Sequence, residues 1–208
     1  MINYAVIGAG TIGKIHAHNI YNLPGINLSY VVDNNYDKAV QLAKLTNCKA
    51  SNNIHDVLSN NAIDAVIIAS STSAHEEHFL ACIEYNKPFI CEKPISTSLG
   101  SAAKCYQKLK ESGIVACMGL NRRLHKDFIT ARKKIIHREI GKIEMVHITS
   151  RSANPPSPES VPFSGGMLRE KGAHFYDLAY WFIGSEPVEV YGSGKCLIDE
   201  NLANYGDV

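Results

Sequence analysis

The stretch Tyr4-Ala5-Val6-Ile7-Gly8-Ala9-Gly10-Thr11-Ile12-Gly13 decides the fold of the first half of the chain. Its first four residues form an apolar run that predicts a strand, and a helical pattern follows from Ile12 to Tyr21. The spacing Gly-x-Gly-x-x-Gly between them is typical of a loop that cradles a dinucleotide pyrophosphate, provided that it joins a strand to a helix. The first glycine permits a tight turn, the second a close approach to the pyrophosphate, and the third close helix–strand packing. The residues we expect at the phosphates are Gly8, Gly10, Thr11, Ile12 and Gly13.

An acidic residue after the second expected strand indicates which dinucleotide cofactor the chain would bind. Asp33 lies 20 residues after Gly13. A carboxylate there accepts hydrogen bonds from ribose hydroxyls and repels a 2′-phosphate, and the next two residues are asparagines rather than basic residues. This favours NAD over NADP. The alternative is that Asp33 caps the following helix.

Apolar runs and amphipathic segments alternate over the first 119 residues. Such alternation predicts an α/β fold, a doubly wound parallel sheet with right-handed crossovers. The expected strands are 4–7, 28–32, 65–69, 89–91 and 114–118, and the expected helices are 12–21, 36–45, 75–85 and 99–112. We therefore expect a Rossmann domain over residues 1–119.

The pattern changes after Gly119, where we place a domain boundary. Helices are expected at 128–136 and 173–183, and the segments 143–150 and 188–191 alternate as strands do. Two strands predict an α+β domain with an incomplete sheet over residues 120–208. This predicts either a shortened chain or fragment, or a partner chain that supplies the rest. An uncovered sheet face would also favour a homo-oligomer.

Composition excludes several classes of protein. The formal net charge of the 208 residues is +1, which argues against a nucleic-acid or membrane-surface binder. The six cysteines include no CxxC pair, so we expect reduced thiols in a cytoplasmic protein. We expect no signal peptide, no membrane span and no metal site. The first-helix histidines His16 and His18 receive no functional role.

Three further motifs, taken with the glycine loop, resemble the Gfo/Idh/MocA family of NAD(P)-dependent sugar and polyol dehydrogenases. Glu92-Lys93-Pro94 follows the strand expected at 89–91, at the edge where open α/β sheets bind ligands. Asn121-Arg122-Arg123 follows the strand expected at 114–118, and Gly165-Gly166-Met167-Leu168 precedes a helix that carries a histidine. The resemblance covers the chain from Asn3 to Tyr191, and its closest likeness is to the inositol-oxidising branch.

The resemblance implies a Rossmann domain followed by a domain that supports the substrate pocket, so residues 120–208 would be an incomplete α+β substrate domain. It implies a role for Lys93 at the nicotinamide and the reacting hydroxyl, and it places the family's Asp…His pair on Glu170 and His174. Along the cofactor it places Ser70, Ser71, Thr72, His75 and Glu92, and at the substrate Asn121, Arg123, Arg151 and Asp177.

Oxidation of a secondary alcohol removes a hydride and a proton. NAD accepts the hydride, and the protein must supply a base and a donor for the developing alkoxide. His174 suits the base and Lys93 the donor. Glu170 would orient His174 if one helix carries both, because residues four apart share a helix face. The alternative for His174 is a helix histidine packed on its neighbours.

Two positions depart from the family pattern, and they leave the function open between three readings. Glu170 stands where the family has Asp, and Ser152 stands where the inositol branch has Asp. The leading interpretation is an NAD-dependent enzyme that oxidises a ring hydroxyl of a cyclic polyol, and myo-inositol is the leading candidate for that substrate. The others are a dehydrogenase for another sugar or nucleotide-sugar, and an inactive remnant that still binds NAD.

Overall fold

The computed structural model describes residues 1–151 and 166–196. It divides into two compact units, Met1–Gly119 and Leu120–Val208. Two sequence expectations, the departure at Ser152 and the first glycine of the Gly165-Gly166 pair, lie outside the described residues.

The first unit is built on a six-stranded sheet with the strand order β3-β2-β1-β4-β5-β6. All five neighbouring pairs are parallel. This order reverses between β1 and β4, as in a Rossmann fold, and confirms the expected doubly wound sheet. The strands are β1 (Ile2–Ile7), β2 (Ile26–Val32), β3 (Lys49–Ser51), β4 (Ala65–Ile68), β5 (Phe89–Cys91) and β6 (Ala116–Met118).

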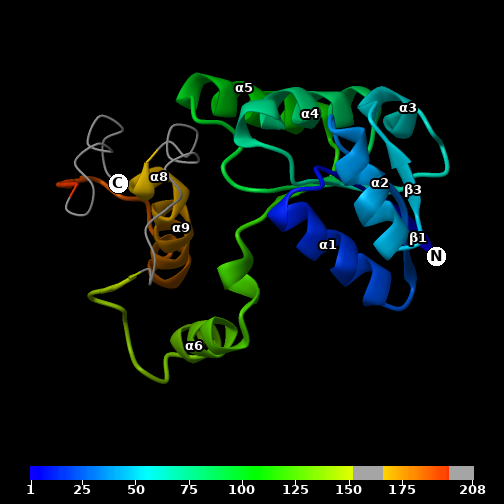
Figure 1. Cartoon of the computed structure of the whole chain (residues 1–208). Coiled ribbons are helices and arrows are strands. Elements are labelled where there is room, and N and C mark those ends of the chain that lie inside the picture. The colour runs from blue at the N-terminus through cyan, green and yellow to red at the C-terminus, as the bar shows by residue number, and fades with distance from the viewer. Residues whose placement is uncertain (152–165, 197–208) are drawn as a thin grey trace. The chain divides into compact units, whose positions relative to one another are not determined.

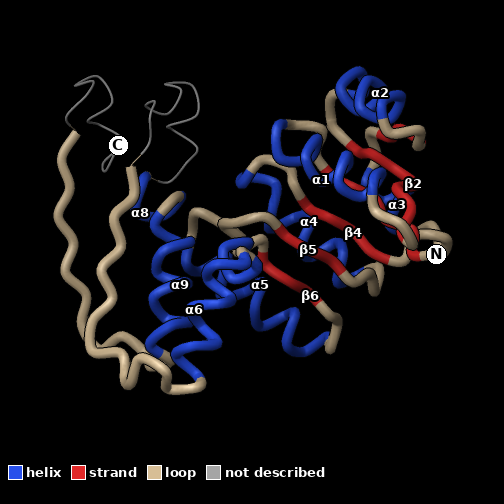
Figure 2. Tube along the Cα trace, turned by 90° about the horizontal axis from the view of Figure 1, so that it is seen from below, coloured by secondary structure: helices blue, strands red, loops and turns tan. Residues whose placement is uncertain are grey.

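Helices cover both faces of this sheet, as Figures 1 and 2 show. They are α1 (Thr11–Asn22), α2 (Tyr36–Leu45), α3 (Ile54–Leu58), α4 (Thr72–Glu84) and α5 (Leu99–Ser112). Alternate residues of one strand enter different cores: Ile7 packs with residues of α3, α4 and α5, whereas Val6 packs with α1 and α2. Strands buried on both faces explain the continuous apolar run at Ala65–Ile68.

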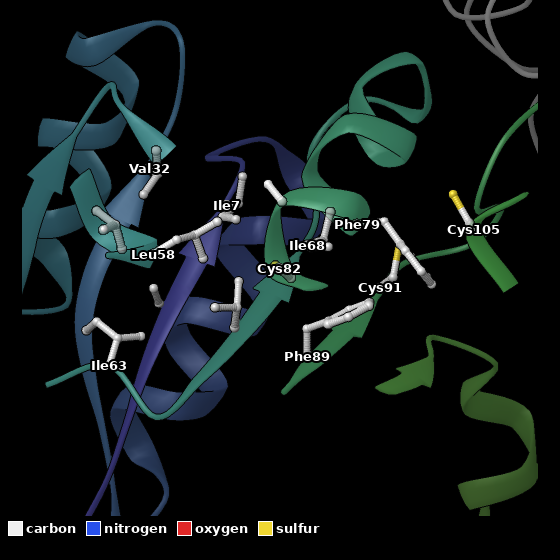
Figure 3. Packing of buried hydrophobic residues seen from close by; sticks show 14 residues of the cluster. Ile7, Val32, Leu58, Ile63, Ile68, Phe79, Cys82, Phe89, Cys91 and Cys105 are labelled. Atoms are coloured by element: carbon white, nitrogen blue, oxygen red, sulfur yellow. The ribbon is translucent and has the colours of Figure 1, made fainter. Parts of the chain in front are cut away.

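Aromatic and sulfur-bearing side chains fill the core beneath α4 and α5 (Figure 3). The rings of Phe79 and Phe89 meet edge to face, with 4.6 Å between their centroids. Cys82 and Cys91 are fully buried beside them, and this burial raises the pKa of the Cys91 thiol to about 12. The core therefore joins α4, which begins after the loop that follows β4, to β5, which ends at the loop that carries Glu92 and Lys93.

The second unit contains a 3-10 turn η1 (Asn121–Leu124) and the helices α6 (Lys126–Ile136), α8 (Met167–Glu170) and α9 (Gly172–Ile183). The expectation of strands at 143–150 and 188–191 is wrong for the described residues, which form loops there (Figure 2). Val188, Val190 and Tyr191 are exposed, so this alternating segment buries no apolar face within the part of the chain that the structure describes. No helix among the described residues is long and apolar enough to cross a bilayer.

Candidate active site

Four loops of the first unit leave the same edge of the sheet. They follow the carboxyl ends of β1, β2, β4 and β5, and all of these strands are parallel. Ligands of open α/β sheets bind outside this edge, at the point where the strand order reverses. Here that point lies between β1 and β4.

The three glycines of the loop after β1 lie in three different environments, and each environment gives a different physical reason for a glycine. Gly8 has a φ of +105°, and a Cβ there would lie 2.5 Å from the Ala69 carbonyl oxygen. A Cβ on Gly13 would lie 1.8 Å from the Gly8 carbonyl oxygen, so helix and loop could not pack as they do. A Cβ on Gly10 would meet nothing within 4 Å. The space beside Gly10 is therefore open to a pyrophosphate, and exposed Thr11 and Ile12 begin α1 next to it.

Asp33 is tied to this loop rather than to a helix. Its Oδ2 accepts a hydrogen bond of 2.7 Å from the Ala9 amide, and its Oδ1 accepts one of 2.9 Å from the Asn35 amide. The residue that caps α2 is Asn35, whose side chain accepts from the Lys38 amide. The capping alternative for Asp33 is therefore wrong. Its carboxylate orders the phosphate loop and keeps lone pairs for a ribose, because a carboxylate has about four acceptor positions.

The loop after β4 holds the next group of expected residues. Ser71 is exposed at the start of α4, Thr72 is half-buried, and Ser70 Oγ lies 2.9 Å from Nδ1 of His78. His75 differs from them, because its ring is only 2% exposed. Its Nδ1 lies 2.7 Å from the Pro94 carbonyl oxygen and its Nε2 lies 3.0 Å from the Ser70 carbonyl oxygen.

Glu92 and Lys93 follow β5, and both are half-buried. Nε2 of His16, on α1, donates a hydrogen bond of 2.8 Å to Glu92 Oε1. A Cβ on Gly119 would lie 2.6 Å from the same carboxylate, so a glycine leaves room for it. Burial alone would raise the pKa of Glu92, but the hydrogen bond and charge of His16, together with Lys93, lower it below 4.5.

The pairing of His16 with Glu92 was missed by the sequence analysis. The two residues are 76 positions apart, and a local pattern carries no information on such a pair. The available signal was the helical spacing from Gly13 to Ala17 and Ile20, which are buried, because it places His16 beside the face that packs on the sheet.

In the second unit, two of the expected substrate residues form an ion pair. Nε of Arg123 donates to Oδ2 of Asp177 at 2.8 Å, and its Nη2 donates to Oδ1 at 2.5 Å. This bidentate pair joins η1 to α9, the helix that carries His174. Arg122 lies over the Phe175 ring, 4.6 Å from its centroid. Asn121 and Arg151, the other expected substrate residues, are exposed.

Glu170 and His174 belong to two helices. Glu170 ends α8 and His174 lies in the first turn of α9, with Lys171 between the helices. The condition of one continuous helix is therefore not met, and the i,i+4 argument does not by itself bring the two side chains together. Both residues are half-buried.

Comparison with protein families decides the relationship. The family model "Oxidoreductase family, NAD-binding Rossmann fold" matches residues 2–120, and the model "GFO/IDH/MocA C-terminal domain" matches residues 128–207. The chain belongs to the GFO/IDH/MocA oxidoreductase family. The resemblance seen in the sequence motifs is thereby confirmed.

Known GFO/IDH/MocA proteins similar to this chain include enzymes named for inositols. The chain is 33% identical over 204 residues to myo-inositol 2-dehydrogenase of Thermotoga maritima, covering 98% of this chain and 61% of that protein. It is 33% identical over 209 residues to scyllo-inositol 2-dehydrogenase (NAD(+)) of Bacillus subtilis, covering 100% and 61%. The crystal structure of a myo-inositol dehydrogenase from Corynebacterium glutamicum superposes with a TM-score of 0.93 at 29% identity, covering 100% and 62%. The chain thus spans about three-fifths of the length of these relatives.

The residues at the sheet edge fit the NAD that the GFO/IDH/MocA family model implies. Gly10 leaves open space in front of the helix, and the Asp33 carboxylate lies beside the same loop. Lys93 lies on the loop after β5, two strands from β1 in the sheet. These three features supply a phosphate cradle, a ribose acceptor and a cationic donor on one edge of one sheet.

Proposed function

We propose that the protein is an NAD-dependent oxidoreductase that oxidises a ring hydroxyl of a cyclic polyol to the ketone. Its proposed substrate is myo-inositol. The observation that carries this proposal is the common edge that holds the glycine loop, Asp33 and Lys93. The inositol names of the relatives support the substrate class. Buried thiols such as Cys82 and Cys91 favour the reducing environment of a cytoplasmic protein.

The chain's own residues provide the proton chemistry of this reaction. NAD, when bound, accepts the hydride from the carbinol carbon. The ammonium of Lys93 donates to the hydroxyl oxygen and stabilises the negative charge that develops there. His174 takes the hydroxyl proton as general base, and Glu170 orients its ring. The paired Arg123 and Asp177 hold the first turns of α9 against η1, and Asn121 and Arg151 bind polyol hydroxyls.

The phosphate loop and the loop after β4 bind the cofactor. Amides at the start of α1 and the side chain of Thr11 contact the pyrophosphate, with Ile12 beside it. Asp33 accepts from the ribose hydroxyls, and Ser70, Ser71 and Thr72 line the nicotinamide half together with Glu92. In this proposal residues 1–119 form the NAD-binding domain and residues 120–208 contribute to substrate binding.

The deciding experiment follows NADH absorbance when the purified chain is mixed with NAD and myo-inositol. We expect NADH to form with the unchanged chain and with Lys108→Ala, a matched control on the exposed face of α5. Lys93→Ala should lower kcat by about a hundredfold or more, because one preorganised donor is worth about 10²–10³ in rate. Activity that persists unchanged in Lys93→Ala would exclude the role given to that lysine.

The identity of the substrate is tested by measuring kcat/KM with a panel of inositols, hexoses and nucleotide-sugars. One relative is named for scyllo-inositol, so a second inositol is the specific alternative to myo-inositol. We expect the highest kcat/KM with myo-inositol, followed by scyllo-inositol, and lower values with hexoses and nucleotide-sugars. The chain would be an inactive NAD-binding protein if it bound NAD but turned over no member of the panel. The same result with the variant Glu170→Asp would exclude the substitution at position 170 as the cause.

A further inference from the structure

The ring of His75 connects two loops at the edge of the sheet. His75 lies in the first turn of α4 and is 2% exposed. One ring nitrogen meets the carbonyl of Pro94, after β5, and the other meets the carbonyl of Ser70, after β4. Both distances, 2.7 and 3.0 Å, are those of good hydrogen bonds.

Both partners of the ring are carbonyl oxygens, which only accept hydrogen bonds. A neutral imidazole has one N–H and can donate to one of them, whereas an imidazolium donates to both. In either protonation state, each ring nitrogen of His75 already faces a main-chain carbonyl oxygen of the protein. His75 is therefore badly placed to contact a cofactor directly, which is the role that the family resemblance implied.

The Pro94 carbonyl belongs to the residue directly after Lys93. A hydrogen bond to that carbonyl holds the main chain on which the Lys93 side chain stands. The loop follows a strand of only three residues, Phe89–Cys91, and the amide of Glu92, its first residue, donates to the Ile68 carbonyl at 2.9 Å. A displacement of about 1 Å in a reacting group can lower a rate about a hundredfold.

We propose that His75 is a positioning residue, which fixes the segment Glu92–Pro94 against the loop after β4 and thereby holds Lys93 in place. This inference rests on the proposed function for the role of Lys93. The link between the two loops stands on the geometry alone and can be tested without any turnover.

The chain offers a matched control for the loss of such a link. Lys87 is 8% exposed, and its ammonium donates to the carbonyls of Asn60 and Ile63 at 2.9 and 2.7 Å. It thus joins two loops as His75 does, but at the amino-terminal ends of β4 and β5. Lys87→Met removes a comparable pair of buried hydrogen bonds away from Lys93.

The first readout is hydrogen–deuterium exchange of a peptide that covers residues 92–98, measured by mass spectrometry. His75→Leu keeps the bulk of the side chain but removes both ring nitrogens, and His75→Asn keeps one amide donor near the position of Nδ1. We expect exchange in 92–98 about tenfold faster in His75→Leu, near the unchanged rate in His75→Asn, and unchanged in Lys87→Met. Equal exchange of this peptide in His75→Leu and Lys87→Met would overturn the proposal.

The second readout is the split between kcat and KM in the NADH assay. We expect His75→Leu to lower kcat about tenfold or more with little change in KM for the polyol, because Lys93 is displaced but the polyol contacts remain. His75→Asn should restore most of kcat, and Lys87→Met should leave it unchanged. A purely structural role would lower the folded fraction equally in His75→Leu and Lys87→Met. If the unchanged chain oxidises no polyol, the proposed function fails, while the exchange comparison still decides on the link.

Discussion

At the scale of single residues, Asp33 has two tasks that one substitution can separate. Its carboxylate accepts from the amides of Ala9 and Asn35, and in the proposed complex its charge repels a 2′-phosphate. Asp33→Asn removes the charge but retains an amide oxygen as acceptor. We expect the ratio of the NADP to the NAD dissociation constant, measured by fluorescence titration, to fall about tenfold, equivalent to about 1.4 kcal/mol.

The control at this scale is Asp33→Ala, which removes the acceptor as well. We expect it to weaken both cofactors, because the Ala9 amide loses its partner and the loop before α1 loses its order. If Asp33→Asn left the ratio of the two dissociation constants unchanged, the carboxylate would not be the group that discriminates between NAD and NADP.

At the scale of elements, the hydrogen bond from His16 to Glu92 ties α1 to the loop after β5. The pKa of Glu92 is lowered in the folded state, so its ionisation contributes stability above pH 4.5 that is lost as the pH falls through the lowered value. We expect His16→Ala to lower the free energy of unfolding at pH 7 by about 1–2 kcal/mol. Urea unfolding followed by circular dichroism should show this difference shrinking as the pH falls below 4.5 and Glu92 is protonated in both proteins.

A double-mutant cycle with Glu92→Gln isolates this interaction. The coupling between the two substitutions should be measurable at pH 7 and absent at low pH, where Glu92 is neutral. A loss of stability in His16→Ala that stays constant down to pH 3 would mean that helix packing, and not the bond to Glu92, is the cause.

The elements also show which parts of the fold can be predicted from sequence. The Rossmann half was predictable because its signals are local: glycines that exclude a Cβ, and apolar runs of strand length. The expected helix 36–45 coincides with α2 (Tyr36–Leu45). Segments 143–150 and 188–191 carry a strand pattern, yet a strand also needs a hydrogen-bonded neighbour, which local pattern does not specify.

The sequence predicted which residues belong to the candidate site better than it predicted the contacts between them. Arg123 and Asp177 were both expected, but the ion pair between them depends on how η1 meets α9. The burial of His75 had a signal in the sequence, because His75, Phe79 and Cys82 recur at helical spacing and all are buried. Its two carbonyl partners come from loops on neighbouring strands, which only the folded sheet brings together.

At the scale of the whole molecule, the cysteines report how far the core of the first unit excludes solvent. Cys82, Cys91 and Cys105 are buried between the sheet and the helices α4 and α5, and burial raises the pKa of each thiol. Cys117 is exposed on β6, at the edge of the same sheet. Because only the thiolate is nucleophilic, the raised pKa values slow the reaction of the three buried thiols, and access to reagent favours Cys117.

We therefore expect Cys117 to react first with Ellman's reagent at pH 8, and Cys117→Ser to remove this fast phase. The three buried thiols should react at least about a thousandfold more slowly, since a stability of about 5 kcal/mol allows only rare global opening. Peptide mapping after alkylation assigns each thiol, and denaturant should release the three buried thiols together with the loss of helical circular dichroism. If Cys105 reacted at low denaturant while Cys82 and Cys91 stayed protected, α5 would open separately from the sheet. The core beneath α4 and α5 would then be two cooperative units rather than one.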